Sequence, residues 1–329
     1  MEANPLKTNK LSVGIWTYGK CSDRYVSDGY KPFLDFDQRI EKIKSLKENC
    51  GIELNYPNDL NEENYKERMC KLSEAGLKVS VINVELVCET QWKHGSFSSF
   101  DSSMRELAIL RTKKAMDIAE VCNCNTLNLW LGLDGFDYVF EADYRKGWNY
   151  LVEGIRECAK YRPNIRLALE YKINEPNMKC YINSAGKALA LCLLTGCSNV
   201  GVTLDFGHSL NANENPAESA ALLMGEKRLF HVHINDNYGI CDDDMPAGTV
   251  HWPQFIEFIY WLDKLGYSEW ISVDIYPYRD EAQQANQATI DFVRFVEKVA
   301  ANLKVDFFDG TFPKGMSITR LIEAFKHLE

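Results

Sequence analysis

Short β-rich segments alternate with longer helical segments along nearly the whole chain, and this alternation limits the possible folds more than any other feature. Eight segments have the composition of buried strands: residues 11–18, 51–56, 78–86, 126–132, 166–172, 200–208, 229–236 and 270–278. Segments with apolar residues at helical spacing follow them, at residues 35–49, 61–75, 103–122, 144–161, 181–195, 216–224, 252–266 and 281–302. Such alternation favours parallel strands joined by right-handed crossovers.

Eight strand–helix units predict a closed (β/α)8 TIM barrel, an α/β fold that occupies residues 1–303 as a single domain. An open, dinucleotide-binding sheet fits less well, because no GxGxxG motif follows the first strand. Residues 304–329 fall outside the eight units and are expected to form a C-terminal loop and short helix, either an oligomer arm or a lid over one face of the barrel.

Helix boundaries are signalled at several places. Ser103 and Glu106 have the spacing of a capping box, which predicts a helix start at Ser103. Gly76 and Gly266 follow helical segments, where a glycine at the C-terminal cap is expected.

Charge and hydropathy exclude several classes of protein. The 37 basic and 47 acidic residues give a net charge of −10, without a basic cluster, so neither nucleic acid nor an anionic membrane is an expected partner. The chain has no apolar run long enough to cross a bilayer, and its polar start does not read as a signal peptide. The 11 cysteines include no CxxC pair, which is typical of reduced thiols, so we expect a cytoplasmic protein.

Polar residues collect at the ends of the last four predicted strands and just after them. They are Glu170, Lys172, Asp205, His208, His231, His233, Asp236, Asp242, Asp243, Asp244 and Asp274. In a TIM barrel these strand ends converge on one mouth, where buried carboxylates and imidazoles would be unsatisfied without a cation. Carboxylates with one or two imidazoles suit a hard or borderline divalent ion. We therefore expect one or two ions, manganese first, with magnesium, cobalt or zinc as alternatives.

The period of a β-strand orders some of these candidates. His231 and His233 are two residues apart and share a face, with His233 nearer the mouth. His233 is therefore the predicted metal ligand, and His231 a packed residue or one that supports a ligand. Glu170 and Lys172 also share a face, which places a carboxylate beside an ammonium group.

The segment LEYKINEP at residues 169–176 resembles the LExKxNEP signature of the xylose isomerases, and the remaining constellation resembles the L-rhamnose-isomerase-like branch of that superfamily. The resemblance implies a first metal held by Glu170, Asp205, His233 and Asp274. It implies a second metal held by His208, Asp242 and Asp244, with Asp205 bridging the two. It also implies that Lys172 contacts a substrate oxygen next to the carbonyl.

The resemblance gives Lys172, Glu170 and Asp274 as candidate catalytic residues. Candidate substrate-binding residues are less firmly placed: Trp16, Trp130, His94 and Asp236. The two tryptophans lie at or after strand ends, where they would wall a sugar pocket, although core packing explains them equally. His94 is either the substitute for the histidine that helps to open the sugar ring in xylose isomerases or an exposed loop residue. Asp236 either faces the substrate or supports the metal ligands.

The function predicted from these residues is a divalent-metal aldose–ketose isomerase that acts on an unphosphorylated sugar. In that chemistry the metal chelates adjacent sugar oxygens while hydrogen moves between C1 and C2, and Lys172 stabilises charge on O1. A keto-sugar 3-epimerase is the main alternative, because Glu170 and Asp274 could act on opposite faces of one carbon. A DNA-repair endonuclease or an inosose-processing relative is a further alternative, although the acidic chain disfavours the endonuclease. We also expect a homo-oligomer, either a dimer or a tetramer.

Overall fold

Eight parallel strands close into a barrel in the computed structural model, which describes residues 9–48, 50–303 and 318–326. The barrel strands are β1 (Lys10–Gly14), β2 (Gly51–Tyr56), β3 (Val79–Val84), β4 (Thr126–Trp130), β6 (Arg166–Glu170), β8 (Val200–Asp205), β9 (Leu229–Ile234) and β10 (Trp270–Val273). The ladder between β1 and β10, from Lys10 opposite Trp270 to Val13 opposite Val273, closes the ring. The predicted (β/α)8 barrel is confirmed.

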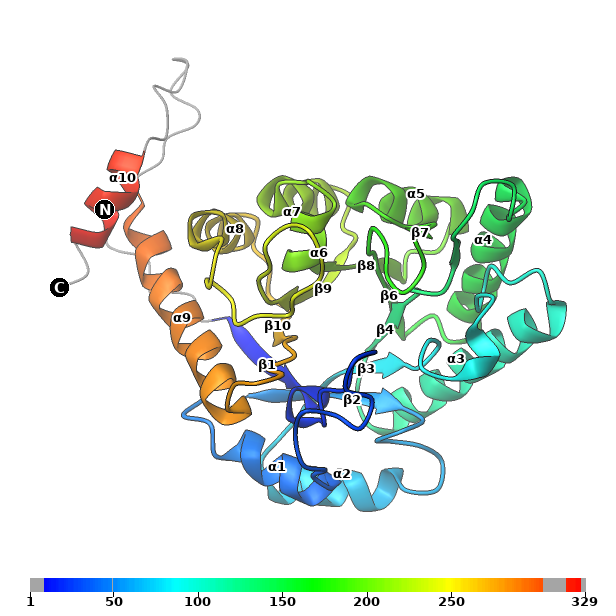
Figure 1. The fold of residues 1–329 in the computed structure, drawn as a ribbon, viewed down its shortest axis with the longest axis horizontal. Coiled ribbons are helices and arrows are strands. Elements are labelled where there is room, and N and C mark those ends of the chain that lie inside the picture. The colour runs from blue at the N-terminus through cyan, green and yellow to red at the C-terminus, as the bar shows by residue number, and fades with distance from the viewer. Residues whose placement is uncertain (1–8, 49, 304–317, 327–329) are drawn as a thin grey trace, which may run out of the picture.

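Helices surround this ring on all sides (Figure 1). They are α1 (Phe36–Lys44), α2 (Tyr65–Glu74), α3 (Ser102–Val121), α4 (Tyr144–Tyr161), α5 (Ala185–Thr195), α6 (Phe206–Asn211), α7 (Pro216–Gly225), α8 (Trp252–Lys264) and α9 (Ala282–Asn302). Two single turns, η1 (Ile15–Tyr18) and η2 (Thr90–Trp92), follow β1 and β3. A two-stranded antiparallel sheet of β5 (Gly135–Phe136) and β7 (Lys179–Cys180) joins the loops after β4 and β6.

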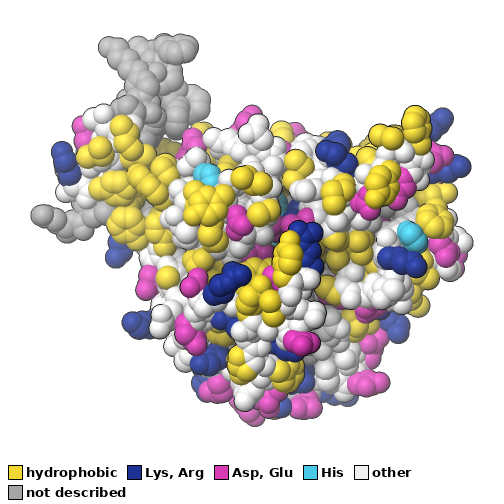
Figure 2. Space-filling view, viewed as in Figure 1, with side chains coloured by type: hydrophobic (Ala, Val, Ile, Leu, Met, Phe, Trp, Pro, Cys, Tyr) yellow, Lys and Arg dark blue, Asp and Glu magenta, His cyan; other side chains and the backbone are white. Residues whose placement is uncertain are grey.

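The C-terminal helix α10 (Ile318–Lys326) packs against α9 at the periphery of the barrel (Figure 1). The rings of Phe295 and Phe325 are stacked, with centroids 6.0 Å apart. Hydrophobic side chains gather over this part of the surface (Figure 2). The predicted loop before the helix falls in residues 304–317, outside the described residues. Among the described helices none is long and apolar enough to span a bilayer.

Capping side chains set most helix starts. The prediction that Ser103 caps α3 is wrong: Asp101 is the N-cap, and its carboxylate accepts a hydrogen bond from the Ser103 backbone N–H at 2.9 Å. Aspartate is as good a cap as serine, and it satisfies one of the unpaired N–H groups of the first turn. Gly76 and Gly266 lie after α2 and α8 with φ of 73° and 75°, the left-handed conformation predicted for them.

Except for β2, the barrel strands end earlier than their apolar composition suggested. β8 stops at Asp205, whose carboxylate caps α6 by accepting from the His208 backbone N–H at 2.7 Å. His208 therefore enters the barrel mouth from the first turn of a short helix, not from the strand predicted to reach it. All six residues of β8 and of β9 are buried, as expected for strands covered on both faces.

Candidate active site

Four side chains from consecutive strand ends meet at the centre of the barrel mouth. Their potential ligand atoms all lie within 4.8 Å of one another, and the residues are Glu170, Asp205, His233 and Asp274. His233 Nδ1 lies 3.2 Å from Glu170 Oε1, 3.1 Å from Asp274 Oδ2 and 4.0 Å from Asp205 Oδ2. Three carboxylates thus surround one imidazole nitrogen. The structure brings together the whole group that the sequence assigned to the first metal.

A buried carboxylate that the sequence did not reveal lies on the other side of His233. Both oxygens of Glu53, from β2, are 3.3 Å from His233 Nε2, and Glu53 Oε1 is 2.6 Å from His231 Nε2. Burial raises the pKa of Glu53, but His233 and His231 outweigh it and hold that pKa well below its usual range. Burial lowers the pKa of His233, but the Glu53, Glu170 and Asp274 carboxylates outweigh it and raise that pKa well above its usual range. Glu53 holds the proton on Nε2, so an ion bound at Nδ1 would take the place of the proton there.

This arrangement also explains His231. Its side chain is 1% exposed and its Nε2 atom faces Glu53, so it lies below His233 as the strand period predicted. Asn83 Nδ2 donates to Glu53 Oε2 at 2.8 Å, which fixes the carboxylate from a third strand.

A hydrogen-bonded chain holds Glu170 from beneath. Asn128 Nδ2 donates to Glu170 Oε2 at 2.6 Å, and Asn128 Oδ1 accepts from the Thr203 hydroxyl at 2.7 Å. All three residues are buried and come from neighbouring strands. The orientation of the Glu170 carboxylate is therefore set by the barrel itself.

A second polar group lies beside the first. His208 Nε2 is 2.9 Å from Asp242 Oδ2, and Lys172 Nζ is 2.8 Å from the same oxygen. His208 Nδ1 lies 3.4 Å from Glu170 Oε1, so the two groups are contiguous. Asp244 lines the same cavity. All the residues predicted for a second metal are thus at the mouth. One of them, Asp242, forms an ion pair with Lys172.

Two buried atoms of this second group accept or donate no hydrogen bond among the described residues: Asp242 Oδ1, and His208 Nδ1, which has only the 3.4 Å contact with Glu170. A buried nitrogen and a buried carboxylate oxygen each cost free energy when left unpaired. Both atoms are ordinary metal-ligand types, so coordination of an ion would satisfy them.

The pKa values of the buried groups also favour a bound cation. Burial, together with the Asp242, Asp274 and Glu170 carboxylates, raises the pKa of Asp205 to about 6. Burial and the Asp242 and Asp274 carboxylates raise the pKa of Asp244 well above its usual range. Burial lowers the pKa of His208, but Asp205 and Asp242 outweigh it and raise that pKa to about 9. The carboxylates outnumber the cationic side chains beside them, so the donor set fits a divalent cation.

Aromatic side chains wall this cavity, whose volume is about 400 Å³. Trp16 Nε1 donates to Asp274 Oδ1 at 2.6 Å, and the ring centroids of Trp16 and His233 are 6.3 Å apart. Lys172 Nζ lies 5.2 Å from the centroid of the Trp130 ring. Both tryptophans lie where the sequence placed them, at the wall of the site. Acidic side chains are visible near the centre of the same face in Figure 2.

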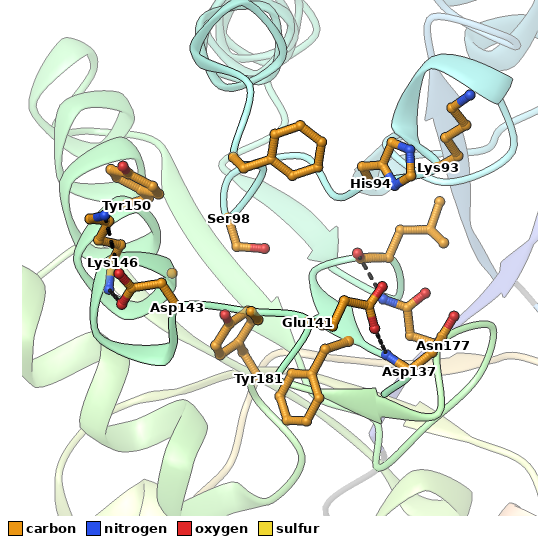
Figure 3. Close-up of a pocket in the computed structure, with 16 residues that line it drawn as sticks. Lys93, His94, Ser98, Asp137, Glu141, Asp143, Lys146, Tyr150, Asn177 and Tyr181 are labelled. Atoms are coloured by element: carbon orange, nitrogen blue, oxygen red, sulfur yellow. Dashed lines mark hydrogen bonds and ion pairs between the residues drawn. The ribbon is translucent and has the colours of Figure 1, made fainter. Parts of the chain in front are cut away.

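Two predicted substrate-binding residues lie elsewhere. Asp236 does not line the cavity, and its buried carboxylate accepts hydrogen bonds from the backbone N–H groups of Asn237, Val250 and His251. In the structure it holds the loop after β9, outside the cavity lining. His94 lines a different cavity, bordered by the loops after β3 and β4 (Figure 3). The proposal that His94 replaces the ring-opening histidine is not supported by its position.

Glu53 gives the first test of this geometry. We expect Glu53→Gln to weaken divalent-metal binding about 10- to 100-fold, because a glutamine amide can no longer hold the Nε2 proton of His233 as a carboxylate does. Titration of the metal-free protein with Mn²⁺ measures the change. The matched control is Glu85→Gln, which alters a carboxylate at the cavity wall that bonds only to Val87 and Cys88 among the described residues. Equal affinity in both variants would remove Glu53 from the metal site.

Comparisons with known proteins agree with this fold. A family model described as xylose isomerase-like TIM barrel matches residues 41–296. A xylose isomerase from Thermus thermophilus is 25% identical over 295 residues, which cover 85% of this chain and 76% of that protein. The solved structure of an L-ribulose 3-epimerase aligns with a TM-score of 0.70 at 16% identity, covering 89% of this chain and 96% of that one. A D-psicose 3-epimerase with D-tagatose, from Clostridium cellulolyticum H10, aligns with a TM-score of 0.66 at 20% identity, covering 88% and 99%.

The structural likenesses concern the fold alone, and resemblance to the L-rhamnose-isomerase-like branch stays a prediction. The family model, however, spans well over half of the chain, and it includes every strand that carries one of the four clustered ligands. The sequence motif and the closed barrel had led to the same family. The chain belongs to the xylose isomerase-like TIM barrel family.

Proposed function

We propose that this protein is a divalent-metal-dependent aldose–ketose isomerase. The observation that carries the proposal is the position of Lys172, whose side chain is buried at the mouth beside both groups of candidate ligands. An ammonium group held there can stabilise negative charge that develops on a sugar oxygen. The xylose isomerase among its relatives supports an isomerase of this class.

The first ion would be held by Glu170, Asp205, His233 and Asp274, and the second by His208, Asp242, Asp244 and Asp205. Manganese is the expected ion, with magnesium, cobalt or zinc as alternatives, since the donor atoms are oxygens with one imidazole for each ion. When bound, the metal supplies polarisation of the sugar carbonyl and chelation of adjacent oxygens.

The chain's own residues have distinct tasks. Lys172 stays protonated, because Asp242, Asp244 and Glu175 outweigh burial and raise its pKa above its usual range. Held by Asp242 at 2.8 Å, its ammonium group can donate to the sugar oxygen next to the carbonyl. Trp16 orients Asp274, and the ring of Trp130 covers Lys172, so both limit the access of water.

A keto-sugar 3-epimerase is the second candidate. Glu170 Oε1 and Asp274 Oδ2 both lie just over 3 Å from His233 Nδ1, so two carboxylates face one point. Such a pair could remove a proton from one face of a carbon and return it on the other. That chemistry gives no task to Lys172 or to the His208–Asp242 pair, so we place the isomerase first. Assembly into a dimer or tetramer remains a prediction.

One experiment separates the two reactions. The metal-free protein is supplied with Mn²⁺, Mg²⁺, Co²⁺ or Zn²⁺ in turn and incubated with a set of free aldoses and ketoses, and the products are identified by chromatography. We expect aldose–ketose pairs that differ at C1 and C2. Products that differ only in the configuration at C3 would favour the epimerase, and conversion of no sugar with any ion would contradict both.

The substrate is expected to be unphosphorylated. The cavity lining carries Lys172 as its one Lys or Arg among the described residues, against six carboxylates: Glu85, Glu170, Glu175, Asp242, Asp244 and Asp274. Arg279, which follows the last barrel strand, is not in the lining, and its guanidinium lies 5.0 Å from the centroid of the Tyr30 ring. Lys314, a cation of the C-terminal segment, is outside the described residues.

A phosphate dianion would therefore be repelled even with metal bound. We expect kcat/KM on a free ketose to exceed that on its terminal phosphate by at least about 100-fold, equivalent to about 2.8 kcal/mol. Steady-state kinetics on the pair measures the ratio. A preference for the phosphate would show that a cation closes over the site.

A further inference from the structure

A second cavity of about 410 Å³ lies beside the metal-binding mouth and shares no lining residue with it among the described residues. Helix α4, the loop after β3 and the β5–β7 sheet enclose it (Figure 3). Its volume is within the range of small-molecule sites, about 300–1,000 Å³. The function proposed above assigns it no role.

Buried hydrogen bonds hold the walls of this cavity in place. The Asp134 carboxylate, itself buried, accepts from the Ser96 backbone N–H at 3.1 Å, from the Ser98 backbone N–H and from the Ser96 hydroxyl. The Asp134 carbonyl accepts from the Tyr181 backbone N–H at 3.0 Å. One residue therefore joins three segments of the wall, and the cavity is formed without a ligand, as is usual for binding sites.

Aromatic rings form much of the inner surface. Tyr150 projects from α4, and Tyr181 lies below it (Figure 3). The ring of Phe136 lies next to that of Tyr181, with the two centroids 5.9 Å apart. Phe100 and His94 form the opposite rim, with centroids 5.4 Å apart. Flat apolar surfaces with a polar edge suit a ligand that has both apolar C–H faces and hydroxyl groups.

The polar groups between the rings offer both donors and acceptors. Glu141 Oε2 accepts from the backbone N–H groups of Asp137 and Tyr138, and Asp137 Oδ1 accepts from that of Met178. Among the described residues the second oxygen of each of these carboxylates has no partner. The Ser98 hydroxyl points into the cavity, and Lys93 forms no ion pair with a described residue (Figure 3).

The charges exclude an anion as the preferred ligand. Asp137, Glu141 and Asp143 bring three negative charges to the lining, against the two positive charges of Lys93 and Lys146. Lys146 is already paired with Asp143, at 3.2 Å. This net negative charge disfavours a phosphate or a carboxylate, whereas it does not repel a neutral polyol.

We propose that this second cavity binds a neutral carbohydrate at a site separate from the metal centre. The aromatic rings provide its apolar contacts, and the unpaired carboxylate oxygens, the Ser98 hydroxyl and the Lys93 ammonium group bind its hydroxyl groups. This proposal does not rest on the isomerase activity, since none of its residues belongs to the metal groups.

Methyl pyranosides test the proposal independently of catalysis. A methyl glycoside has no free anomeric hydroxyl and cannot open to a carbonyl form, so it cannot react as an aldose or ketose. The full chain, stripped of metal, is titrated with the methyl pyranosides of glucose, galactose, mannose, xylose and rhamnose, with saturation-transfer NMR and calorimetry as readouts. We expect at least one to bind one-to-one with a Kd of about 1 mM or lower.

Two variants place the ligand in the cavity. Tyr150→Ala removes one ring, and Ser98→Trp fills the space with a bulky side chain; each should weaken binding about tenfold or more. Tyr138→Ala is the matched control, because Tyr138 lies in the loop that carries Asp137 and Glu141 but is 75% exposed and does not line the cavity. It should leave the affinity unchanged. Circular dichroism confirms that each variant is folded.

Three results would overturn the proposal: no binding of any methyl pyranoside up to about 10 mM, binding that both cavity variants leave intact, or tighter binding of inorganic phosphate than of every pyranoside. Each of them would leave the sugar-conversion experiment unaffected. Conversely, if a methyl pyranoside binds but no isomerase or epimerase activity is found, the proposed second site is still supported.

Discussion

Glu170→Gln is expected to lower kcat/KM by at least about 1,000-fold and to release the ion of the first group, because a ligand that supplies charge to a catalytic metal is worth several kcal/mol. The glutamine amide oxygen can still accept the 2.6 Å hydrogen bond from Asn128, so the strand end keeps its support. What disappears is the negative charge opposite His233 and His208, from whose nitrogens Glu170 Oε1 is 3.2 and 3.4 Å distant. Elemental analysis and steady-state kinetics on the same preparation measure both losses.

The control for this variant is again Glu85→Gln, which changes a carboxylate of the same cavity wall that contacts neither His233 nor His208. It should keep its metal and most of its activity. If Glu170→Gln retained a full complement of metal and wild-type turnover, the metal centre could not lie at the four clustered ligands. The assignment of the first metal to the barrel mouth would then be wrong. Loss of metal with unchanged turnover would instead show that the reaction does not need the ion.

The barrel, and the gathering of polar side chains at its mouth, could be predicted because both depend on local patterns. Buried parallel strands are almost continuously apolar, so an acidic or imidazole side chain at a strand end stands out from its surroundings. Glu170, Asp205, His233 and Asp274 are such residues, and closure of the barrel brings them within 4.8 Å. The LEYKINEP motif then added the position of Lys172.

Glu53 could not be found in the same way, although it is as close to His233 as the predicted ligands are. It belongs to no motif and lies in the second strand, 180 positions away from His233. The one signal was its position between Ile52 and Leu54 in a strand that is otherwise suited to burial. A carboxylate that is 0% exposed requires a partner inside the barrel, but only the closed ring shows that the partner is a pair of histidines.

Loop residues were placed less well because their direction depends on contacts that the sequence does not encode locally. His94 follows η2 in a loop that Asp134 ties to the neighbouring loop, and this turns it toward the second cavity. Asp236 lies just beyond β9, where its carboxylate binds three backbone N–H groups and the ring of His251. Both are polar residues after strand ends, like the candidate metal ligands, and only the fold distinguishes them.

Lys172→Met is expected to lower kcat and kcat/KM together by about 100-fold or more, with a much smaller change in KM. That pattern results when a group stabilises the transition state more than the bound substrate, and about 100- to 1,000-fold is the usual cost of removing one such electrostatic donor. Methionine matches the length and volume of the lysine stem, so the packing against the Trp130 ring is kept while the ammonium group is lost. Steady-state kinetics on the sugar identified by the product screen gives the two constants.

The matched control is Lys179→Met, which removes an exposed lysine of β7 that lies outside the metal-binding cavity. It should leave kcat unchanged. Because Lys172 also forms an ion pair with Asp242, the metal content of Lys172→Met is measured as well. Loss of the second ion together with activity would mean that the lysine positions a metal ligand. Full metal content with a 100-fold lower kcat requires that the ammonium group act on the substrate, and an unchanged kcat would remove the observation on which the isomerase is preferred to the 3-epimerase.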